Sequence, residues 1–160
     1  MENANYKILA IDLMNKIPPP FIAAGNMALF YLSTLVVPKF QFTGQTILAI
    51  FIGLEGLIII FLSIRLFRKN QTTINPFKPH ETTKLITYGV YAFTRNPMYL
   101  ALSSIQVAFG IYLGAYVSIL LIPGFIVYIT YKQIIYEEQT LIKRFGDEYI
   151  TYLKSVRRWI

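Results

Sequence analysis

The longest uncharged stretch of the chain begins after Arg95 and ends at Lys132, and it limits the possible folds more than any other feature. A helix rises ~1.5 Å per residue, so this stretch is far too long for one crossing of a hydrocarbon core ~30 Å thick. The chain must therefore fold back on itself, and the expected turn lies between Gly110 and Gly114. Such a hairpin returns to the side of the membrane that it left, which brings Arg95 close to the residues after Lys132.

Two further apolar stretches precede this hairpin. No charged residue occurs from Pro18 to Val37, and Glu55 is the only one from Phe40 to Ile64. Together with the hairpin halves, residues 97–113 and 115–131, they predict about four transmembrane helices. The chain is 55% hydrophobic and 14% charged, and its apolar residues form long blocks, which is typical of a membrane protein and not of a soluble enzyme.

The expected fold is therefore an all-α, polytopic membrane protein with a single domain over residues 1–160. Residues 1–70 would hold an N-terminal interfacial helix, near residues 6–17, and two spans. Residues 71–160 would hold a loop, the helical hairpin and a C-terminal helix. We expect Asn96 to cap the third span, which Pro97 opens.

The net charge of +7 is unevenly distributed. Lysines and arginines crowd the segment between the second and third spans and the tail after the fourth, whereas the predicted outer loop holds only Lys39. The positive-inside rule then places the middle loop and the C-terminus in the cytoplasm, and four spans put the N-terminus there as well. We expect the membrane to be a bacterial inner membrane. Basic residues at span ends explain the charge without a nucleic-acid partner. With no cysteine and one histidine, we expect no disulfide and no metal site.

Two polar clusters bracket the hairpin. The first runs from Gly89 to Tyr99, and the second begins at Glu137-Glu138 and continues to Tyr152. In this order they resemble the family of integral-membrane methyltransferases that includes isoprenylcysteine carboxyl methyltransferases and phospholipid N-methyltransferases. The resemblance covers roughly residues 72–159, and the positions that fit are Gly89, Tyr91, Arg95, Pro97, Tyr99, Glu137, Glu138, Phe145, Gly146 and Tyr149.

The resemblance implies an enzyme that transfers a methyl group from S-adenosylmethionine to a small or lipophilic acceptor. The cytoplasmic loop and the C-terminal helix would form the cofactor pocket, and the acceptor would enter from the lipid bilayer. A sulfonium is already an activated methyl donor, so the protein supplies positioning and a dry pocket. The implied cofactor contacts are Thr83, Lys84, Leu85, Ile86, Tyr91, Asn96, Pro97, Met98, Tyr99 and Glu137.

Three charged residues are the implied catalytic group. Arg95 would orient the acceptor or the cofactor carboxylate, because its planar guanidinium holds such groups at two points. Glu137 would be the anionic partner of the cofactor's amino group or ribose hydroxyls, and Glu138 would pair with Arg95 or hold the loop. The alternative is that Arg95 and the glutamates form an ion pair that only locks the helix ends together.

Asn96 and Thr83 stand where this family commonly has histidine. Asn96 can donate a hydrogen bond but cannot titrate near neutral pH, so a proton shuttle there is in doubt. His80, the sole histidine, either replaces the missing one or is a solvated loop residue.

Glu55 and Gln133 are candidate substrate-binding residues. Glu55 lies in the middle of a predicted span, where a charge is costly unless it is paired or protonated. It either faces the cofactor cavity or an entry path, or is a neutral carboxyl bonded to Asn26, Gln106 or a backbone carbonyl. Gln133 lies one turn before the glutamates, where family members that act on prenylated cysteine have an arginine.

Two other functions compete with methyl transfer. Some sterol reductases look similar over the same C-terminal helices and use NADPH, although such enzymes usually have more spans. A non-catalytic membrane protein, whose loop and tail merely dock together, is the other alternative.

Overall fold

The computed structural model describes residues 17–73 and 79–160, and all of the regular structure in these ranges is helical. The predicted interfacial helix near residues 6–17 lies almost wholly outside the described residues. The main helices are α2 (Pro19–Ser33), α3 (Gln45–Lys69), α4 (Pro97–Leu113), α5 (Ser118–Ile129), α6 (Ile135–Phe145) and α7 (Asp147–Ser155). Three short helical segments connect them: η1 (Pro79–Glu81), η2 (Gly89–Ala92) and η3 (Thr130–Ile134).

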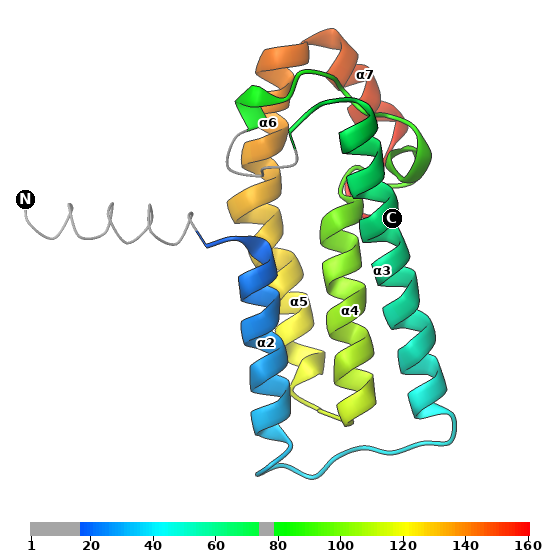
Figure 1. Ribbon diagram of the computed structural model, residues 1–160. Helices are drawn as coiled ribbons and strands as arrows, with labels where there is room; N and C mark the ends of the chain where they lie inside the picture. Colours follow the sequence, from blue (N-terminus) through cyan, green and yellow to red (C-terminus); the bar gives the residue numbers. More distant parts are fainter. Residues whose placement is uncertain (1–16, 74–78) are drawn as a thin grey trace, which may run out of the picture.

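Four helices, α2 to α5, run side by side as a bundle (Figure 1). The central helix α4 packs against α3, α2 and α5, whereas α2 and α3 hardly touch each other. A core of buried residues holds the α2, α4 and α5 side together: Ala23, Tyr99, Phe125, Ile129 and Ile134. The bundle is therefore built around the N-terminal half of the predicted hairpin.

The predicted fold-back between Arg95 and Lys132 is confirmed. Helix α4 ends at Leu113, and Gly114 adopts the left-handed conformation with φ of 66°, which suits glycine. The Gly114 carbonyl accepts a hydrogen bond from the backbone N–H of Phe40 at 3.0 Å. The turn is thus fastened to the connection between α2 and α3.

Helix α5 continues through η3 into α6 as one helix from Ser118 to Phe145, and η3 has π-helical geometry. This helix and α3 are each long and apolar enough to cross a membrane, and α4 is a shorter apolar helix. Large apolar side chains on the outside of the bundle are exposed, among them Phe51, Phe61, Leu120 and Val127. This surface is the one expected of helices in contact with lipid.

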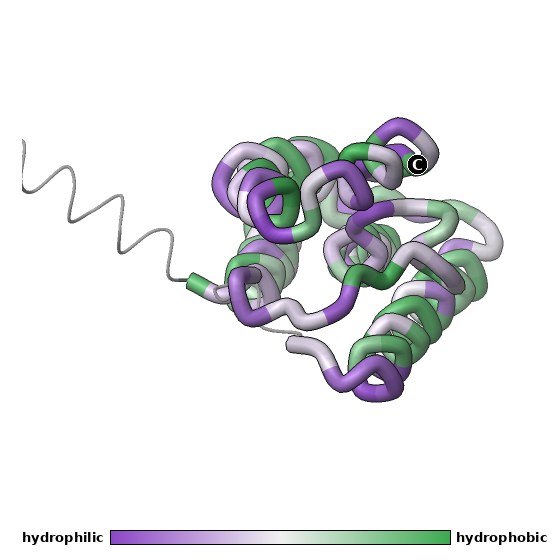
Figure 2. Tube along the Cα trace, turned by 90° about the horizontal axis from the view of Figure 1, so that it is seen from above, coloured by the Kyte–Doolittle hydropathy of each residue, from purple (hydrophilic) through white to green (hydrophobic). Residues whose placement is uncertain are grey.

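The polar part of the chain covers one end of the bundle. Viewed from that end, hydrophilic residues follow the near loops and helix ends, and the helices beneath are mostly hydrophobic (Figure 2). The cap consists of residues 79–96 with α6 and α7. Gly146, with φ of 53°, interrupts the C-terminal helix and separates α6 from α7.

Candidate functional site

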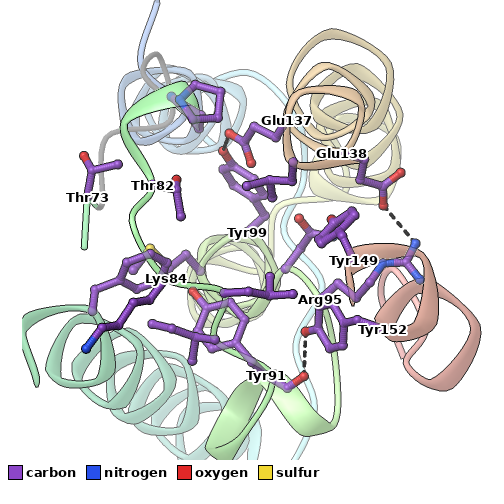
Figure 3. Close-up of a pocket in the computed structure, with 18 of the residues that line it drawn as sticks. Thr73, Thr82, Lys84, Tyr91, Arg95, Tyr99, Glu137, Glu138, Tyr149 and Tyr152 are labelled. Carbon is purple, nitrogen blue, oxygen red and sulfur yellow. Dashed lines mark hydrogen bonds and ion pairs between the residues drawn. The ribbon is translucent and has the colours of Figure 1, made fainter. Parts of the chain in front are cut away.

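A cavity of about 520 Å³ lies where the cap meets the bundle. Its walls come from the beginning of α2, the end of α3, the 79–96 loop, the first turns of α4, and α6 and α7. Figure 3 shows the Glu137 carboxyl group directed toward the hydroxyl of Tyr99, and Tyr91, Arg95, Tyr149 and Tyr152 on another side of the lining. The lining comprises Pro18, Pro19, Pro20, Phe67, Thr73, Pro79, Thr82, Lys84, Leu85, Ile86, Tyr91, Arg95, Asn96, Met98, Tyr99, Leu102, Glu137, Glu138, Leu141, Tyr149 and Tyr152.

Helix α4 begins at the cavity. Pro97 occupies its first turn, where a missing N–H costs nothing, and Asn96 takes the cap position. The predicted cap position is therefore confirmed, but the Asn96 side chain makes no capping hydrogen bond, and its Nδ2 donates to the carbonyl oxygen of Arg158 at 2.9 Å. The start of α4 is thus tied to the C-terminal residues, and Met98 and Tyr99 face the cavity.

Glu137 is held by two neutral donors. The Tyr99 hydroxyl donates to its Oε1 at 2.6 Å, and Gln133 Nε2 donates to the same oxygen at 2.7 Å. None of the described residues donates to Oε2. One carboxylate oxygen is therefore anchored, and the other remains available to a donor in the cavity.

Glu138 is held by two arginines. Its Oε1 accepts from Arg95 Nη2 at 2.8 Å and from Arg158 Nε at 3.0 Å, and its Oε2 accepts from Arg158 Nη2 at 2.7 Å. Glu138 is only 8% exposed, so these charge-assisted bonds lie largely out of solvent. The fold-back thus unites Arg95 with Glu138, and this pair is one of the two predicted roles of Glu138.

The Arg95 guanidinium also fastens the end of α7. Its Nη1 donates to the carbonyl oxygens of Leu153 and Val156, which lie where a helix leaves carbonyls unpaired. Its Nε is buried and has no hydrogen-bond partner among the described residues. The structure therefore contains the Arg95–Glu138 ion pair that was expected if these residues only lock the helix ends together. It also leaves one donor of Arg95, a residue that lines the cavity, without a partner among the described residues.

Three buried tyrosines form an aromatic side of the site. Burial raises the pKa of Tyr91, Tyr149 and Tyr152 above the usual value, so all three stay neutral at physiological pH. The Tyr152 hydroxyl donates to the carbonyl of Tyr91 at 2.7 Å, and the Tyr149 and Tyr152 rings pack edge to face. This bond joins α7 to η2.

Most of the predicted cofactor-binding residues line the cavity: Lys84, Leu85, Ile86, Tyr91, Asn96, Met98, Tyr99 and Glu137. Thr83 does not. Its N–H donates to the Thr72 hydroxyl at 2.9 Å and its own hydroxyl donates to the Gln71 carbonyl, so Thr82 faces the cavity in its place. Pro97 is buried in the first turn of α4 and is not part of the lining either.

The two predicted substrate-binding residues lie outside the cavity lining. Glu55 is exposed on α3 and has no hydrogen bond to the described residues, and Asn26 bonds to Gln106 at 2.9 Å instead of to Glu55. Gln133 is buried and contributes by holding Glu137. His80 is exposed, and its carbonyl accepts a hydrogen bond from Arg144.

Several lining residues were not predicted, notably Thr82, Leu102, Leu141, Tyr149 and Tyr152. The last three belong to the apolar face of the tail, which repeats at helical spacing in the sequence. This apolar face could have indicated these three residues, because the helices that follow the glutamates must bury their apolar side next to the site. No comparable sequence pattern around Arg158 indicated that this residue binds Glu138.

Comparisons with known proteins identify the family of the chain. A model of the phospholipid methyltransferase family matches residues 44–148, which is more than half of the chain and includes Arg95, Glu137 and Glu138. An uncharacterized protein of Haemophilus influenzae is 43% identical over 63 residues, which are 39% of this chain and all of that protein. No solved structure matches. The chain belongs to the phospholipid methyltransferase family of integral-membrane methyltransferases.

Proposed function

We propose that this protein transfers a methyl group from S-adenosylmethionine to a small or lipophilic acceptor drawn from the membrane. The observation that carries the proposal is the cavity itself. It brings the loop residues Lys84 to Ile86, the Arg95–Glu138 pair and Glu137 together at the polar end of an apolar bundle. Family membership supports the methyl transfer, and this arrangement supports the place where it would occur.

The lining suits S-adenosylmethionine. Its volume of about 520 Å³ falls in the ~300–1,000 Å³ range of small-molecule sites. Glu137 offers Oε2 to an ammonium or to ribose hydroxyls, and the positive charge of Arg95 beside the cavity suits a carboxylate. The apolar and aromatic side chains would cover the nucleoside.

The sulfonium of the donor supplies an activated methyl group, so the residues of this chain need only bind, orient and exclude water. Arg95 and Glu138 are held by several hydrogen bonds each, which fixes their positions before any ligand arrives. Glu137 is fixed by Tyr99 and Gln133. Met98, Leu102 and Leu141 are apolar and would keep water from the transferring carbon.

A lipophilic acceptor suits the opposite side of the cavity. Pro18 to Pro20 at the start of α2 and Phe67 near the end of α3 both line it, and these two helices hardly touch each other. An apolar molecule in the bilayer would therefore meet the site between α2 and α3. An acceptor carboxylate would need no base, whereas a protonated amine would need one.

Ligand-induced stabilisation tests the proposal. We expect S-adenosylmethionine and S-adenosylhomocysteine to raise the unfolding temperature of the purified protein, because a ligand at a hundred times its Kd stabilises the folded state by about 2.7 kcal/mol. Labelled methyl incorporation into lipid, thiol and prenyl-peptide extracts would then identify the acceptor. Stabilisation by NADPH alone would favour the reductase alternative, and stabilisation by none of the three would contradict an enzyme of either class.

A further inference from the structure

The residues after α7 are bonded to residues that line the candidate site. We call residues 156–160 the closing segment. Its backbone accepts four hydrogen bonds from the end of the cap loop. The Arg95 N–H donates to the Arg157 carbonyl at 3.0 Å, and Arg95 Nη1 donates to the Val156 carbonyl. Thr94 Oγ1 and Asn96 Nδ2 donate to the Arg158 carbonyl at 3.1 and 2.9 Å. Thr94 and Asn96 are buried, so these bonds are shielded from water.

The side chain of Arg158 forms the second attachment. Its guanidinium holds both oxygens of Glu138, through Nε at 3.0 Å and Nη2 at 2.7 Å. This is the bidentate geometry in which an arginine binds a carboxylate most firmly. Arg95 reaches the same carboxylate through one nitrogen only, Nη2. Arg158 is therefore the arginine that holds both oxygens of Glu138.

Trp159 forms the third attachment. Its Nε1 donates to the Thr130 hydroxyl at 3.2 Å, and its ring packs on the core that contains Tyr99 and Ile134. Thr130 opens the π-helical segment η3, whose last residues, Gln133 and Ile134, precede the glutamates by one turn. The closing segment thus contacts the cap loop, α6 and η3 within five residues.

We propose that the closing segment is a clamp for the site and that Arg158 is its positioning residue. This rests on the proposed function. Arg158 does not line the cavity, so it acts through Glu138. While Arg158 holds both oxygens of Glu138, Arg95 keeps one bond to that carboxylate. Without Arg158, Glu138 is free to turn, and Arg95 is no longer held in one orientation toward the reacting groups.

Arg158→Ala and Arg158→Lys test the clamp in the full-length protein, with Arg157→Ala as the matched control. Arg157 is the adjacent residue with the same charge, and its side chain is exposed. We expect Arg158→Ala to lower kcat at least tenfold with less than a threefold change in the KM for S-adenosylmethionine, because orientation is lost rather than a direct contact. Arg158→Lys keeps the charge without the planar fork and should restore only part of the rate. Arg157→Ala should behave as the wild type.

Fluorescence gives a readout that does not depend on activity, since Trp159 is the only tryptophan in the chain. We expect its emission to shift to longer wavelength and its quenching by acrylamide to rise in Arg158→Ala but not in Arg157→Ala. A variant Arg158→Ala with wild-type kcat overturns the positioning role, and one with wild-type emission overturns the attachment through Arg158. A wild-type protein that is inert with S-adenosylmethionine overturns the proposed function instead, and the emission still decides the attachment.

Discussion

Glu137 and Glu138 are neighbours in the chain but have different partners. Successive residues of a helix point about 100° apart, so only one of the two faces the arginines. Glu138 is fixed by Arg95 and Arg158, whereas Glu137 is bonded by the neutral groups of Tyr99 and Gln133. The geometry gives Glu138 a supporting position, whereas Oε2 of Glu137 has no donor among the residues that the structure describes.

Glu137→Gln tests this difference. The amide oxygen can still accept from Tyr99, so we expect a small change in the unfolding temperature, but the negative charge for the cofactor is lost. Methyl transfer should fall by roughly a hundredfold, in the range seen when one preorganised electrostatic contact is removed. Initial rates with a labelled methyl donor measure this effect.

Glu148→Gln is the matched control, because Glu148 is exposed on α7 and its charge is removed by the same substitution. Full activity in Glu137→Gln would remove Glu137 from the site. A large loss in both variants would mean that the net charge of the cap, rather than this carboxylate, controls the rate.

At the scale of single residues, the sequence predicted residue types better than orientations. It indicated the segment 83–86, but the loop turns Thr83 toward Gln71 and Thr72 and presents Thr82 to the cavity. It also predicted a capping role for Asn96, whose side chain instead binds a carbonyl of the closing segment. Both outcomes depend on contacts with residues that are distant in the chain or on the path of an irregular loop, which no local pattern encodes.

At the scale of elements, the hairpin turn depends on Gly114. Gly114 has φ of 66°, and a Cβ added there would lie 2.2 Å from the carbonyl oxygen of Phe40. Gly114→Ala should therefore lower the free energy of unfolding by about 2 kcal/mol or more, from the left-handed conformation and the clash together. Thermal unfolding in detergent measures this loss.

Gly124→Ala serves as its control. Gly124 lies inside α5, where an added Cβ meets nothing within 4 Å. Alanine favours a helix over glycine by up to ~1 kcal/mol, so this variant should be neutral or slightly more stable. Equal destabilisation by both substitutions would contradict the role of the Gly114 turn.

The apolar blocks and proline positions predicted most elements correctly. Helix α2 begins within the Pro18–Pro20 run, α4 begins at Pro97, and Gly146 separates α6 from α7. The π-helical segment η3 was not predicted, since its residues, TYKQI, carry no distinguishing signal. A π turn accommodates an extra residue and rotates the helix beyond it, so it helps to determine which face of α6 carries the glutamates.

At the scale of the whole molecule, the proposed topology has four spans with both ends of the chain in the cytoplasm. The connection between α2 and α3 lies at one end of the bundle, and the cap with α7 lies at the other (Figure 1). Helix α2 has 15 residues and α4 has 17, so they are about 22–26 Å long at ~1.5 Å per residue. These lengths suit a thin or locally thinned bilayer.

Single cysteines test this topology, because the chain has none of its own. We expect Lys39→Cys to react with a membrane-impermeant maleimide in intact cells. Lys154→Cys on α7 should react only after the membrane is permeabilised; both native side chains are exposed. Labelling of both from the same side would contradict an odd number of spans between them and the proposed orientation of the cap.

The sequence by itself determined the membrane hairpin, the main helices and the motif that joins Arg95 to the glutamates. Hydropathy, proline and glycine act through local energetics, so they can be interpreted along the chain. Only the tertiary structure decided which neighbouring side chains face the cavity, and that Arg158 binds the Glu138 carboxylate beside it. Those outcomes depend on helix register and on contacts between residues about sixty positions apart, such as Asn96 with Arg158.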